Sequence, residues 1–381
     1  MSFSVLFYVQ HLLGIGHLQR CLRISEALVR EGVAVTLVCG GEPVALPRDR
    51  SVRLVQLTPI RALDARFELV DSAGRPIDDA LREERRAALL EAFAAARPDA
   101  VIIEGFPFAR RAFRFELEPL IAAVRAATPR PRLLCSVRDI VVVRDDPQRH
   151  RDIVERVRRD FDAVLVHGDP GLIRLDASFP AAPEIADRVI YTGYVCPPAA
   201  SLDAAALTGG DEVVVSAGGG AAGHALLEAA LAARRSGCLA RHPWRFFAGT
   251  NLPEAAFAAL REDLPPGVAV ERFCYNFVGL LRGCRVSVSQ AGYNTVLDIV
   301  AAQARAVLVP LAAGRETEQP MRAERLAALG AAELVRENDL SAQSLGAAIE
   351  RAAAREPARL AIDTGGAAHA ARLIAAMKRP G

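Results

Sequence analysis

Short apolar runs alternate with amphipathic segments through the first half of the chain. The apolar runs lie at residues 3–9, 33–39, 52–57, 100–104, 132–136 and 163–166. Apolar positions at helical spacing fill the intervals, at residues 17–31, 78–96, 111–127 and 149–160. Continuous apolar strands separated by helices are typical of a parallel sheet that is covered on both faces. The pattern therefore predicts a Rossmann-like α/β domain over residues 1–196.

A second series of the same kind follows a stretch rich in Pro, Ala and Gly at residues 196–212, which we interpret as a linker. Its strands are expected at 213–216, 244–247, 268–272, 285–288 and 306–309, and its helices at 223–236, 292–303 and 319–329. We therefore expect a second Rossmann-like domain over 197–365, and a C-terminal segment, 366–381, whose helix packs back on the first domain. Two such domains would face a central cleft that is lined by the carboxyl ends of both sheets.

Composition narrows the classes of protein. The 381 residues are 51% hydrophobic and 24% charged, and no apolar run reaches the roughly eighteen residues of a membrane helix. With no basic leader at the N-terminus, we expect a soluble, cytoplasmic protein. A net charge of +2 argues against a nucleic-acid partner, and arginine pairs such as Arg85-Arg86 are expected on solvated helix faces. The seven cysteines form no Cys-x-x-Cys motif, so neither a metal site nor a cofactor is expected.

The first candidate for chemistry is Gly14-Ile15-Gly16-His17, which follows the first strand and opens a helix. Gly14 and Gly16 allow a tight turn and are also candidate donor-binding residues, and His17 would sit in the first helical turn. A helix N-terminus lowers the pKa of a histidine, so a neutral His17 would suit a general base; a capping or packing role is the alternative. The dinucleotide fingerprint is absent, because Gln19 stands where its third glycine would be.

Polar residues also lie at the carboxyl ends of two other predicted strands in the first half. Glu104 ends one apolar run, and Ser136-Val137-Arg138-Asp139 ends the next. We therefore place Glu104 and Arg138 on the acceptor side of the site. Asp139 is the second candidate for a catalytic base.

The glycine loop Ser216-Ala217-Gly218-Gly219-Gly220 holds the matching place in the second half, directly after its first strand. Glycines before a helix can cradle a diphosphate through backbone N–H groups, with no lysine needed. Ser216, Gly218, Gly219 and Gly220 are therefore candidate donor-binding residues, and a flexible turn is the alternative.

Residues 289–298 also join a strand to a helix, and this turn suits an anion or a sugar hydroxyl. Gly292, Asn294 and Thr295 open the helix, and Asp298, about a turn and a half later, could accept a hydrogen bond from a ribose. An ordinary turn in which Asn and Thr cap the helix is the alternative. The loop after 306–309 ends on Glu318-Gln319, whose polar groups suit sugar hydroxyls unless the loop is simply a solvated surface.

Together these segments resemble the GT-B glycosyltransferases of family 28. The likeness spans both halves and is strongest at the pattern Ser-x-x-Gly-x-x-Thr-Val-x-Glu, in which Asp298 takes the glutamate place. The resemblance implies that Asp298 holds the ribose, that Glu318-Gln319 replaces a Gln-Gln pair at the donor sugar, and that Phe273 lies on the donor side. Segments 104–108 and 136–139 are most similar to those of predicted glycosyltransferases, and the short Gly-x-Gly-His loop also resembles that of a nucleotide-sugar hydrolase.

The resemblance implies a glycosyltransferase of the hexosyltransferase type. It would move a sugar from a nucleotide-diphosphate donor, expected to be a UDP-sugar, to a hydroxyl acceptor, with inversion and without a metal. His17 would deprotonate the acceptor while the second domain holds the nucleotide. A nucleotide-sugar hydrolase and a non-catalytic nucleotide-sugar binder are the alternatives. A lipid-linked acceptor would bring peripheral association with a membrane.

Overall fold

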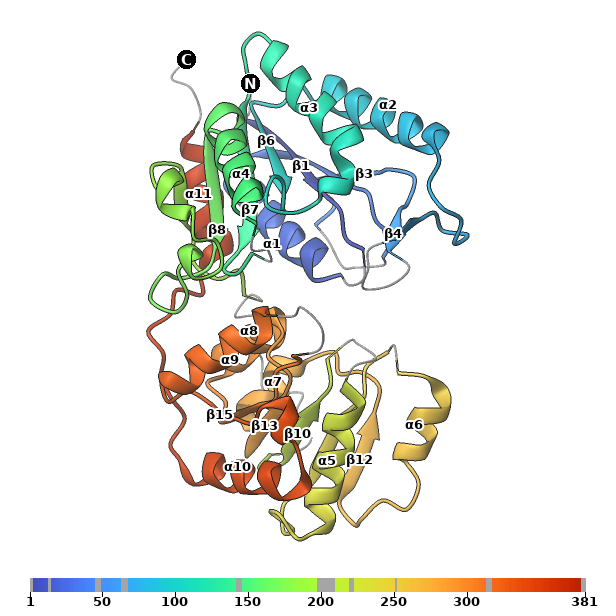
Figure 1. The fold of residues 1–381 in the computed structure, drawn as a ribbon, viewed down its shortest axis with the longest axis vertical. Helices are drawn as coiled ribbons and strands as arrows, with labels where there is room; N and C mark the ends of the chain where they lie inside the picture. The colour runs from blue at the N-terminus through green and yellow to red at the C-terminus, as the bar shows by residue number, and fades with distance from the viewer. Residues whose placement is uncertain are drawn as a thin grey trace. The chain divides into compact units, whose positions relative to one another are not determined.

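The structure is a computed structural model that divides into two compact units (Figure 1). Unit 1 comprises Met1–Val195 and Asp363–Gly381, and unit 2 comprises Cys196–Ile362. The residues described are 3–12, 15–44, 49–62, 68–141, 146–196, 210–218, 223–250, 252–312 and 317–377. Each unit is built on one parallel sheet, so the predicted α/β class with two Rossmann-like sheets is confirmed.

Unit 1 contains a seven-stranded parallel sheet in the order β3-β2-β1-β6-β7-β8-β9. Its strands are β1 (Ser4–Val9), β2 (Ala34–Cys39), β3 (Val52–Gln56), β6 (Ala100–Glu104), β7 (Arg132–Arg138), β8 (Ala163–His167) and β9 (Val189–Tyr191). The helices are α1 (Gly16–Arg30), α2 (Asp79–Ala96), α3 (Arg114–Ala126), α4 (Pro147–Asp160) and α11 (Gly366–Ala376). The sequence pattern did not predict β9 or the short antiparallel pair β4 (Arg61–Ala62) and β5 (Leu69–Val70), because these strands have only two or three residues each.

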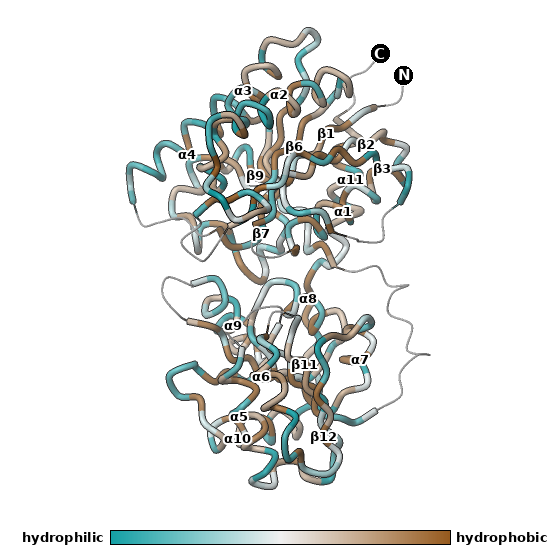
Figure 2. The backbone as a smooth tube through the Cα atoms, turned by 90° about the vertical axis from the view of Figure 1, so that its right-hand side faces the viewer, coloured by the Kyte–Doolittle hydropathy of each residue, from teal (hydrophilic) through white to brown (hydrophobic). Residues whose placement is uncertain are grey.

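Both faces of this sheet are buried. Alternate residues of β1 face opposite ways: Leu6 and Tyr8 join the core under α2, α3 and α4, whereas Phe7 joins the core with α1 and α11. Helix α11 packs against α1, and Figure 2 shows the two on the same side of the sheet. The continuous apolar pattern of β1 and β6, brown in Figure 2, follows from this burial on both faces.

Unit 2 contains a six-stranded parallel sheet in the order β12-β11-β10-β13-β14-β15. Its strands are β10 (Val213–Ser216), β11 (Trp244–Phe247), β12 (Val268–Glu271), β13 (Val286–Ser289), β14 (Ala306–Leu308) and β15 (Glu333–Leu334). Its helices are α5 (His224–Arg235), α6 (Glu254–Leu260), α7 (Phe277–Gly283), α8 (Tyr293–Ala302), α9 (Glu318–Ala328) and α10 (Ala342–Ala354). The pattern did not predict β15, α6, α7 or α10; the first three have two to seven residues, and four of the six buried residues of α10 are alanine or glycine. No described helix of either unit is long and apolar enough to cross a membrane.

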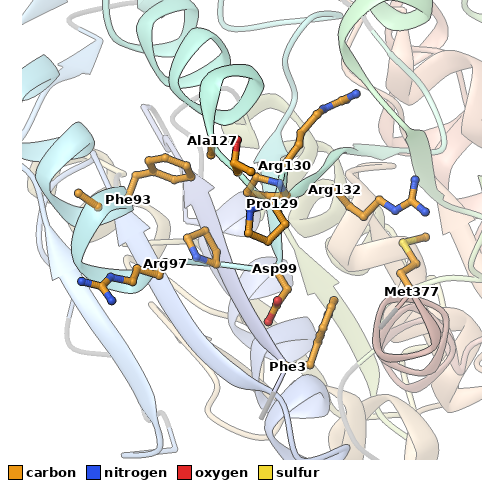
Figure 3. A pocket seen from close by; sticks show the side chains of 13 residues that line it. Phe3, Phe93, Arg97, Asp99, Ala127, Pro129, Arg130, Arg132 and Met377 are labelled. Atoms are coloured by element: carbon orange, nitrogen blue, oxygen red, sulfur yellow. The ribbon is translucent and has the colours of Figure 1, made fainter. Parts of the chain in front are cut away.

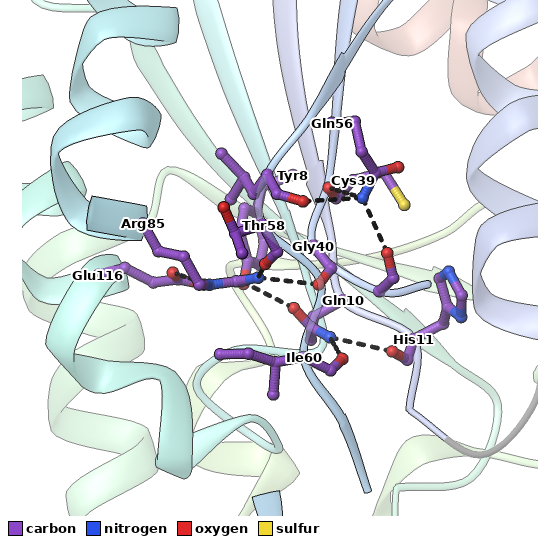
Figure 4. A network of polar contacts seen from close by, with 12 residues as sticks. Tyr8, Gln10, His11, Cys39, Gly40, Gln56, Thr58, Ile60, Arg85 and Glu116 are labelled. Atoms are coloured by element: carbon purple, nitrogen blue, oxygen red, sulfur yellow. Dashed lines mark hydrogen bonds and ion pairs between the residues drawn. The ribbon is translucent and has the colours of Figure 1, made fainter. Parts of the chain in front are cut away.

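A fully buried polar network ties the loops at the carboxyl ends of β1 and β2 to α2 and α3 (Figure 4). Arg85 donates from Nε to Glu116 Oε2 at 2.9 Å and from Nη2 to Glu116 Oε1 at 2.7 Å. Its remaining N–H groups reach the carbonyl of Gly40 at 2.8 Å and Gln10 Oε1 at 2.9 Å. The hydroxyl of Tyr8 also donates to Glu116. The expectation that Arg85 lies on a solvated face was therefore wrong, because the face of α2 that carries Arg85 packs against α3.

Candidate functional site

The first part of the site lies at the carboxyl edge of the sheet of unit 1. His17 stands in the first turn of α1, and its Nδ1 lies 2.7 Å from Oε1 of Glu104. Glu104 ends β6, which pairs with β1 in parallel, so the start of α1 and the end of β6 meet at one edge. Gly16 begins α1, whereas Gly14 lies outside the described residues.

The contact with Glu104 determines the tautomer of His17. An ionised carboxylate only accepts hydrogen bonds, so Nδ1 carries the proton and donates it, leaving the lone pair on Nε2. Burial lowers the pKa of His17 to about 4, although the negative charge of Glu104 opposes this. The imidazole is therefore neutral at pH 7. Its side chain remains 26% exposed, which gives a substrate access to it.

Two arginines keep Glu104 ionised. Arg20 Nη2 donates to Glu104 Oε1 at 2.7 Å, and Arg110 Nη2 lies 3.6 Å from Oε2. Burial alone would raise the pKa of Glu104, but the interactions with His17, Arg110 and Arg20 outweigh burial and hold it well below its usual range. Sequence reasoning missed Arg20. Its signal was its spacing of three residues from His17, which puts both side chains on one face of α1.

The other residues predicted for this edge lie in different surroundings from those expected. Glu104 is almost wholly buried, so in this structure it contacts His17 and arginines. Asp139 is also buried; its Oδ1 accepts from the N–H of Ile140 at 2.9 Å and its Oδ2 from the hydroxyl of Tyr194 at 3.0 Å. That placement favours a structural role for Asp139. Arg138 ends β7, and its positive charge is one of those that act on His17.

The second part of the site lies at the carboxyl edge of the sheet of unit 2. Ser216 ends β10 and is paired in register with Ser289, which ends β13. Gly218 has a φ of +67°, a conformation that favours glycine, and its N–H donates to Ser216 Oγ at 3.3 Å. The backbone therefore turns sharply where a glycine loop was predicted. Gly219 and Gly220 lie outside the described residues.

Helix α8 begins directly after Gly292 at the same edge. Gly292 has no side chain with which to cap the helix, so the N–H groups of the first turn point toward the loop end. Asn294, Thr295 and Asp298 are half-buried on α8. Phe273 is 57% exposed beyond β12, and its ring meets that of Tyr275 edge-on at 5.1 Å between centroids.

Glu318 and Gln319 make contacts within the protein at the start of α9. Gln319 Oε1 accepts from the backbone N–H groups of Ala291 and Leu311, both at 3.1 Å. Glu318 Oε1 pairs with Arg322 Nη2 at 2.8 Å, and Arg322 Nη1 donates to the carbonyl of Ala291 at 2.9 Å. These contacts hold the turn before α8. Sequence reasoning missed Arg322, whose signal was the spacing of four from Glu318.

Two observations concern a metal ion and a cavity outside the site. Among the residues that the structure describes, no three His, Cys, Asp or Glu side chains are grouped so that they could hold a metal ion. A cavity of about 390 Å³ opens at the opposite, amino edge of the sheet of unit 1 (Figure 3). Phe3, Phe93, Arg97, Pro129, Arg132 and Met377 line it, and none of these residues belongs to either carboxyl edge.

Comparison with known proteins finds a family match within the second half of the chain. Residues 250–376 match the glycosyltransferase family 28 C-terminal domain, a region that includes α8 and the start of α9. Over 110 residues the chain is 34% identical to the UDP-N-acetylglucosamine–N-acetylmuramyl-(pentapeptide) pyrophosphoryl-undecaprenol N-acetylglucosamine transferase of Phenylobacterium zucineum. That match covers 28% of this chain and 30% of the relative, so it spans less than a third of either protein.

Solved structures match the whole chain at low identity. MurG of Acinetobacter baumannii has a TM-score of 0.63 and 18% identity, over 98% of this chain and 100% of that one. CalG4, the calicheamicin glycosyltransferase, has a TM-score of 0.61 and 18% identity, over 99% and 95% of the two chains. The chain therefore has the GT-B fold of these glycosyltransferases, and its residues 250–376 match the family 28 C-terminal domain. The family match and the similarity to the Phenylobacterium transferase over 110 residues confirm the predicted resemblance to family 28.

Proposed function

We propose that this GT-B glycosyltransferase transfers a sugar from a UDP-sugar to a hydroxyl acceptor, with His17 as general base and with inversion at the anomeric carbon. The observation that carries the proposal is the 2.7 Å contact between His17 Nδ1 and Glu104 Oε1. It orients the imidazole and keeps its basic lone pair on Nε2. A histidine so placed at the start of the first helix can accept the proton of an acceptor hydroxyl.

The reaction follows from these groups. Nε2 of His17 removes the hydroxyl proton while the acceptor oxygen forms a bond to the anomeric carbon. The bond from that carbon to the donor's phosphate oxygen breaks, and its electron pair leaves with the nucleoside diphosphate. Attack opposite the leaving group inverts the configuration. Glu104 stabilises the imidazolium that forms, and Arg20 keeps Glu104 ionised.

The donor is assigned to unit 2. The N–H groups at the start of α8 are suited to a diphosphate, because the first turn of a helix offers donors that have no partner within the helix. The turn at Gly218 lies at the same sheet edge, where a glycine allows close approach to the backbone. Gln319 and Arg322 support this assignment, since both fix Ala291 in the turn that precedes α8. The choice of uridine rests on the Phenylobacterium relative, whose name gives UDP-N-acetylglucosamine as its donor.

A ligand screen followed by a transfer assay tests the proposal. Nucleoside diphosphates and nucleotide sugars are added in a thermal-shift series, in which a ligand at 100 times its Kd stabilises the folded state by about 2.7 kcal/mol. UDP and UDP-sugars should raise the melting temperature most, and a glycoside should then form from a hydroxyl acceptor. Release of free sugar at the same rate with and without acceptors would contradict transfer, and stabilisation by another nucleotide alone would contradict the choice of UDP.

Asp298→Ala is expected to weaken UDP binding by about 1.5–3 kcal/mol, because a charge-assisted hydrogen bond to the ribose is lost. Binding of 2′-deoxy-UDP should weaken much less, and calorimetry with both nucleotides measures the difference. Glu324→Ala, at an exposed acid of α9, is the control and should leave both affinities unchanged. Equal weakening of the two nucleotides would show that Asp298 supports the helix instead of the ribose.

A further inference from the structure

The chain leaves unit 1 once and returns to it once, and the two crossing segments pair with each other inside unit 1. They comprise residues 192–195 and 363–366, and we call them together the crossover clasp. Tyr194 donates from its backbone N–H to the carbonyl of Asp363 at 2.7 Å, and its own carbonyl accepts from the N–H of Gly366 at 3.0 Å. The outgoing and the returning segment are therefore joined to each other at the boundary of unit 1.

The two segments pack backbone against backbone, and this close approach depends on glycine. A Cβ on Gly193, whose φ is +83°, would lie 2.5 Å from the carboxylate of Asp363. A Cβ on Gly366 would lie 2.2 Å from the carbonyl oxygen of Gly193. Neither distance is possible for a real side chain, so any other residue at these two positions would force the segments apart.

Two buried side chains at the carboxyl edge of the sheet hold the outgoing segment. Asp139, directly after β7, accepts with Oδ2 from the hydroxyl of Tyr194 at 3.0 Å, and both residues are buried. His167, which ends β8, lies with Nδ1 2.8 Å from Oγ1 of Thr192 and with Nε2 2.9 Å from Oγ of Ser136. Burial lowers the pKa of His167 to about 3, so the imidazole is neutral at pH 7 and uses both ring nitrogens in hydrogen bonds. The outgoing segment is thus bound to the ends of two strands.

The returning segment is bound to the same edge. Asp169, two residues beyond β8, accepts with Oδ2 from the N–H of Asp363 at 2.8 Å. The carboxylate of Asp363 in turn accepts from the N–H of Gly365 at 2.8 Å, directly before α11 begins at Gly366. Strand β8 neighbours β7, and β7 neighbours the strand that ends on Glu104. The clasp and the partner of the proposed base therefore lie along one sheet edge.

A segment serves as a hinge when its backbone dihedral angles are free to change. In the clasp, backbone groups of Tyr194, Asp363 and Gly366 are already engaged in hydrogen bonds. Tyr194 and Gly366 are also buried, and opening a buried hydrogen bond costs free energy because no water replaces the partner. The clasp is therefore poorly suited to act as a hinge, although the chain crosses between the units there.

We propose that Asp139 is a positioning residue that keeps the clasp closed through Tyr194, so that unit 2 moves relative to unit 1 about bonds outside the clasp. This inference goes beyond the proposed function, because it concerns the crossing chain and holds for any donor or acceptor. It also assigns to Asp139 a role other than that of a base. With the clasp closed, movement of unit 2 leaves the contact between His17 and Glu104 undisturbed.

Hydrogen exchange of the full chain, followed by mass spectrometry of peptides that cover 192–196 and 363–369, tests the clasp without any transfer reaction. In the unchanged chain the backbone amides of Tyr194 and Gly366 should exchange as slowly as those of β8. Tyr194→Phe should accelerate their exchange about tenfold, because the buried carboxylate of Asp139 loses this donor. The amides of β1 should keep their rates, because the opening is local.

Matched variants separate the clasp from a general loss of packing. Tyr191→Phe removes a hydroxyl from the same stretch of chain, but that hydroxyl accepts from the N–H of Leu175 at 2.7 Å, outside the clasp. It should leave the exchange of both segments unchanged. Asp139→Asn keeps a polar group opposite Tyr194 and should exchange more slowly than Asp139→Ala, which removes that group. Asp169→Ala, which removes the anchor of the returning segment, carries the test if Tyr194→Phe does not fold.

A disulfide across the clasp tests whether it stays closed during turnover. Val195 and Gly365 form an antiparallel bridge, in which the Cα atoms are close enough for a disulfide. Val195→Cys and Gly365→Cys are combined with Cys196→Ala, which removes a competing thiol. A closed clasp predicts the same turnover before and after oxidation. A loss of turnover on oxidation that dithiothreitol reverses would mean that the clasp opens.

Fast exchange of the clasp amides in the unchanged chain would overturn the inference, as would an effect of Tyr194→Phe no larger than that of Tyr191→Phe. Equal acceleration throughout unit 1 would overturn it too, because Tyr194 would then support the whole fold. The exchange measurements require no sugar transfer, so each of these results leaves the proposed transferase function standing. A protected clasp in a chain that transfers no sugar would reject only the proposed function.

Discussion

His17→Ala is expected to lower kcat by a factor of about 10² to 10⁴, or about 3–5 kcal/mol of barrier, because general-base assistance typically contributes that much. The affinity for UDP should be nearly unchanged, since the proposed donor-binding groups belong to unit 2. Steady-state rates with an acceptor found in the transfer assay measure kcat, and calorimetry measures the Kd for UDP. His242→Ala, at a histidine just before β11 on the amino edge of the sheet of unit 2, is the control and should retain full turnover.

The pH dependence of the transfer rate tests the role of His17 independently. Only the neutral imidazole accepts a proton, and burial lowers the pKa of His17 to about 4. The rate should therefore fall as the pH drops through about 4 and should have no limb from this group between pH 5 and 8. His17→Ala should lack the acidic limb. A variant with normal turnover, or one that keeps the limb, would remove His17 from the chemistry.

The sequence predicted the place of His17 but not its partner. A Gly-x-Gly-His motif after an apolar run is a local pattern, and it locates the histidine at a strand-to-helix turn. Glu104 is 87 residues away, and its contact with His17 depends on β6 lying next to β1 in the sheet. Strand order is determined by packing and crossovers over the whole domain. The local pattern therefore placed Glu104 at the carboxyl edge of the sheet but could not predict its contact with His17.

The buried arginines were also beyond the reach of local patterns. Arg85 and Arg86 are neighbours in a chain with many arginines, and both were expected on a solvated face. The structure buries Arg85 completely and leaves the side chain of Arg86 44% exposed. Adjacent residues on a helix point about 100° apart, so one of them can face α3 while the other faces water. The acceptor for Arg85, Glu116, lies on a different helix and is not signalled by spacing.

In unit 2, too, local structure was predicted from the sequence, whereas contacts between distant segments were not. The turn at 289–298 combines an apolar run, a glycine and a helix start within a few residues, so its structure is encoded locally and was predicted correctly. The contacts of Gln319 and Arg322 with Ala291 join segments separated by 28 and 31 residues. Sequence likeness assigned Glu318 and Gln319 to the sugar, but it carried no information on the backbone groups that these side chains contact.

Arg85→Met is expected to destabilise unit 1 by about 3–5 kcal/mol, because removing one partner of a buried ion pair leaves the other charge unpaired. Glu116 would be stranded in the core, and the carbonyl of Gly40 and the side chain of Gln10 would each lose a donor. Hydrogen exchange of amides in β1 and β6 measures the free energy of opening of unit 1. Fluorescence of Trp244, the single tryptophan, reports on unit 2 and should not change.

Two further variants separate the stranded charge from lost packing. Glu116→Gln in the Arg85→Met background removes the charge while keeping an oxygen for the hydroxyl of Tyr8, so it should recover about 1–2 kcal/mol. Arg86→Met breaks the exposed pair with Glu83 on the same helix and should cost less than about 0.5 kcal/mol. If Arg85→Met costs no more than Arg86→Met, the network does not hold the loops of this edge. Since Gln10 links Arg85 to the carbonyls of His11 and Ile60, that result would also mean that the loop before His17 is positioned by other contacts.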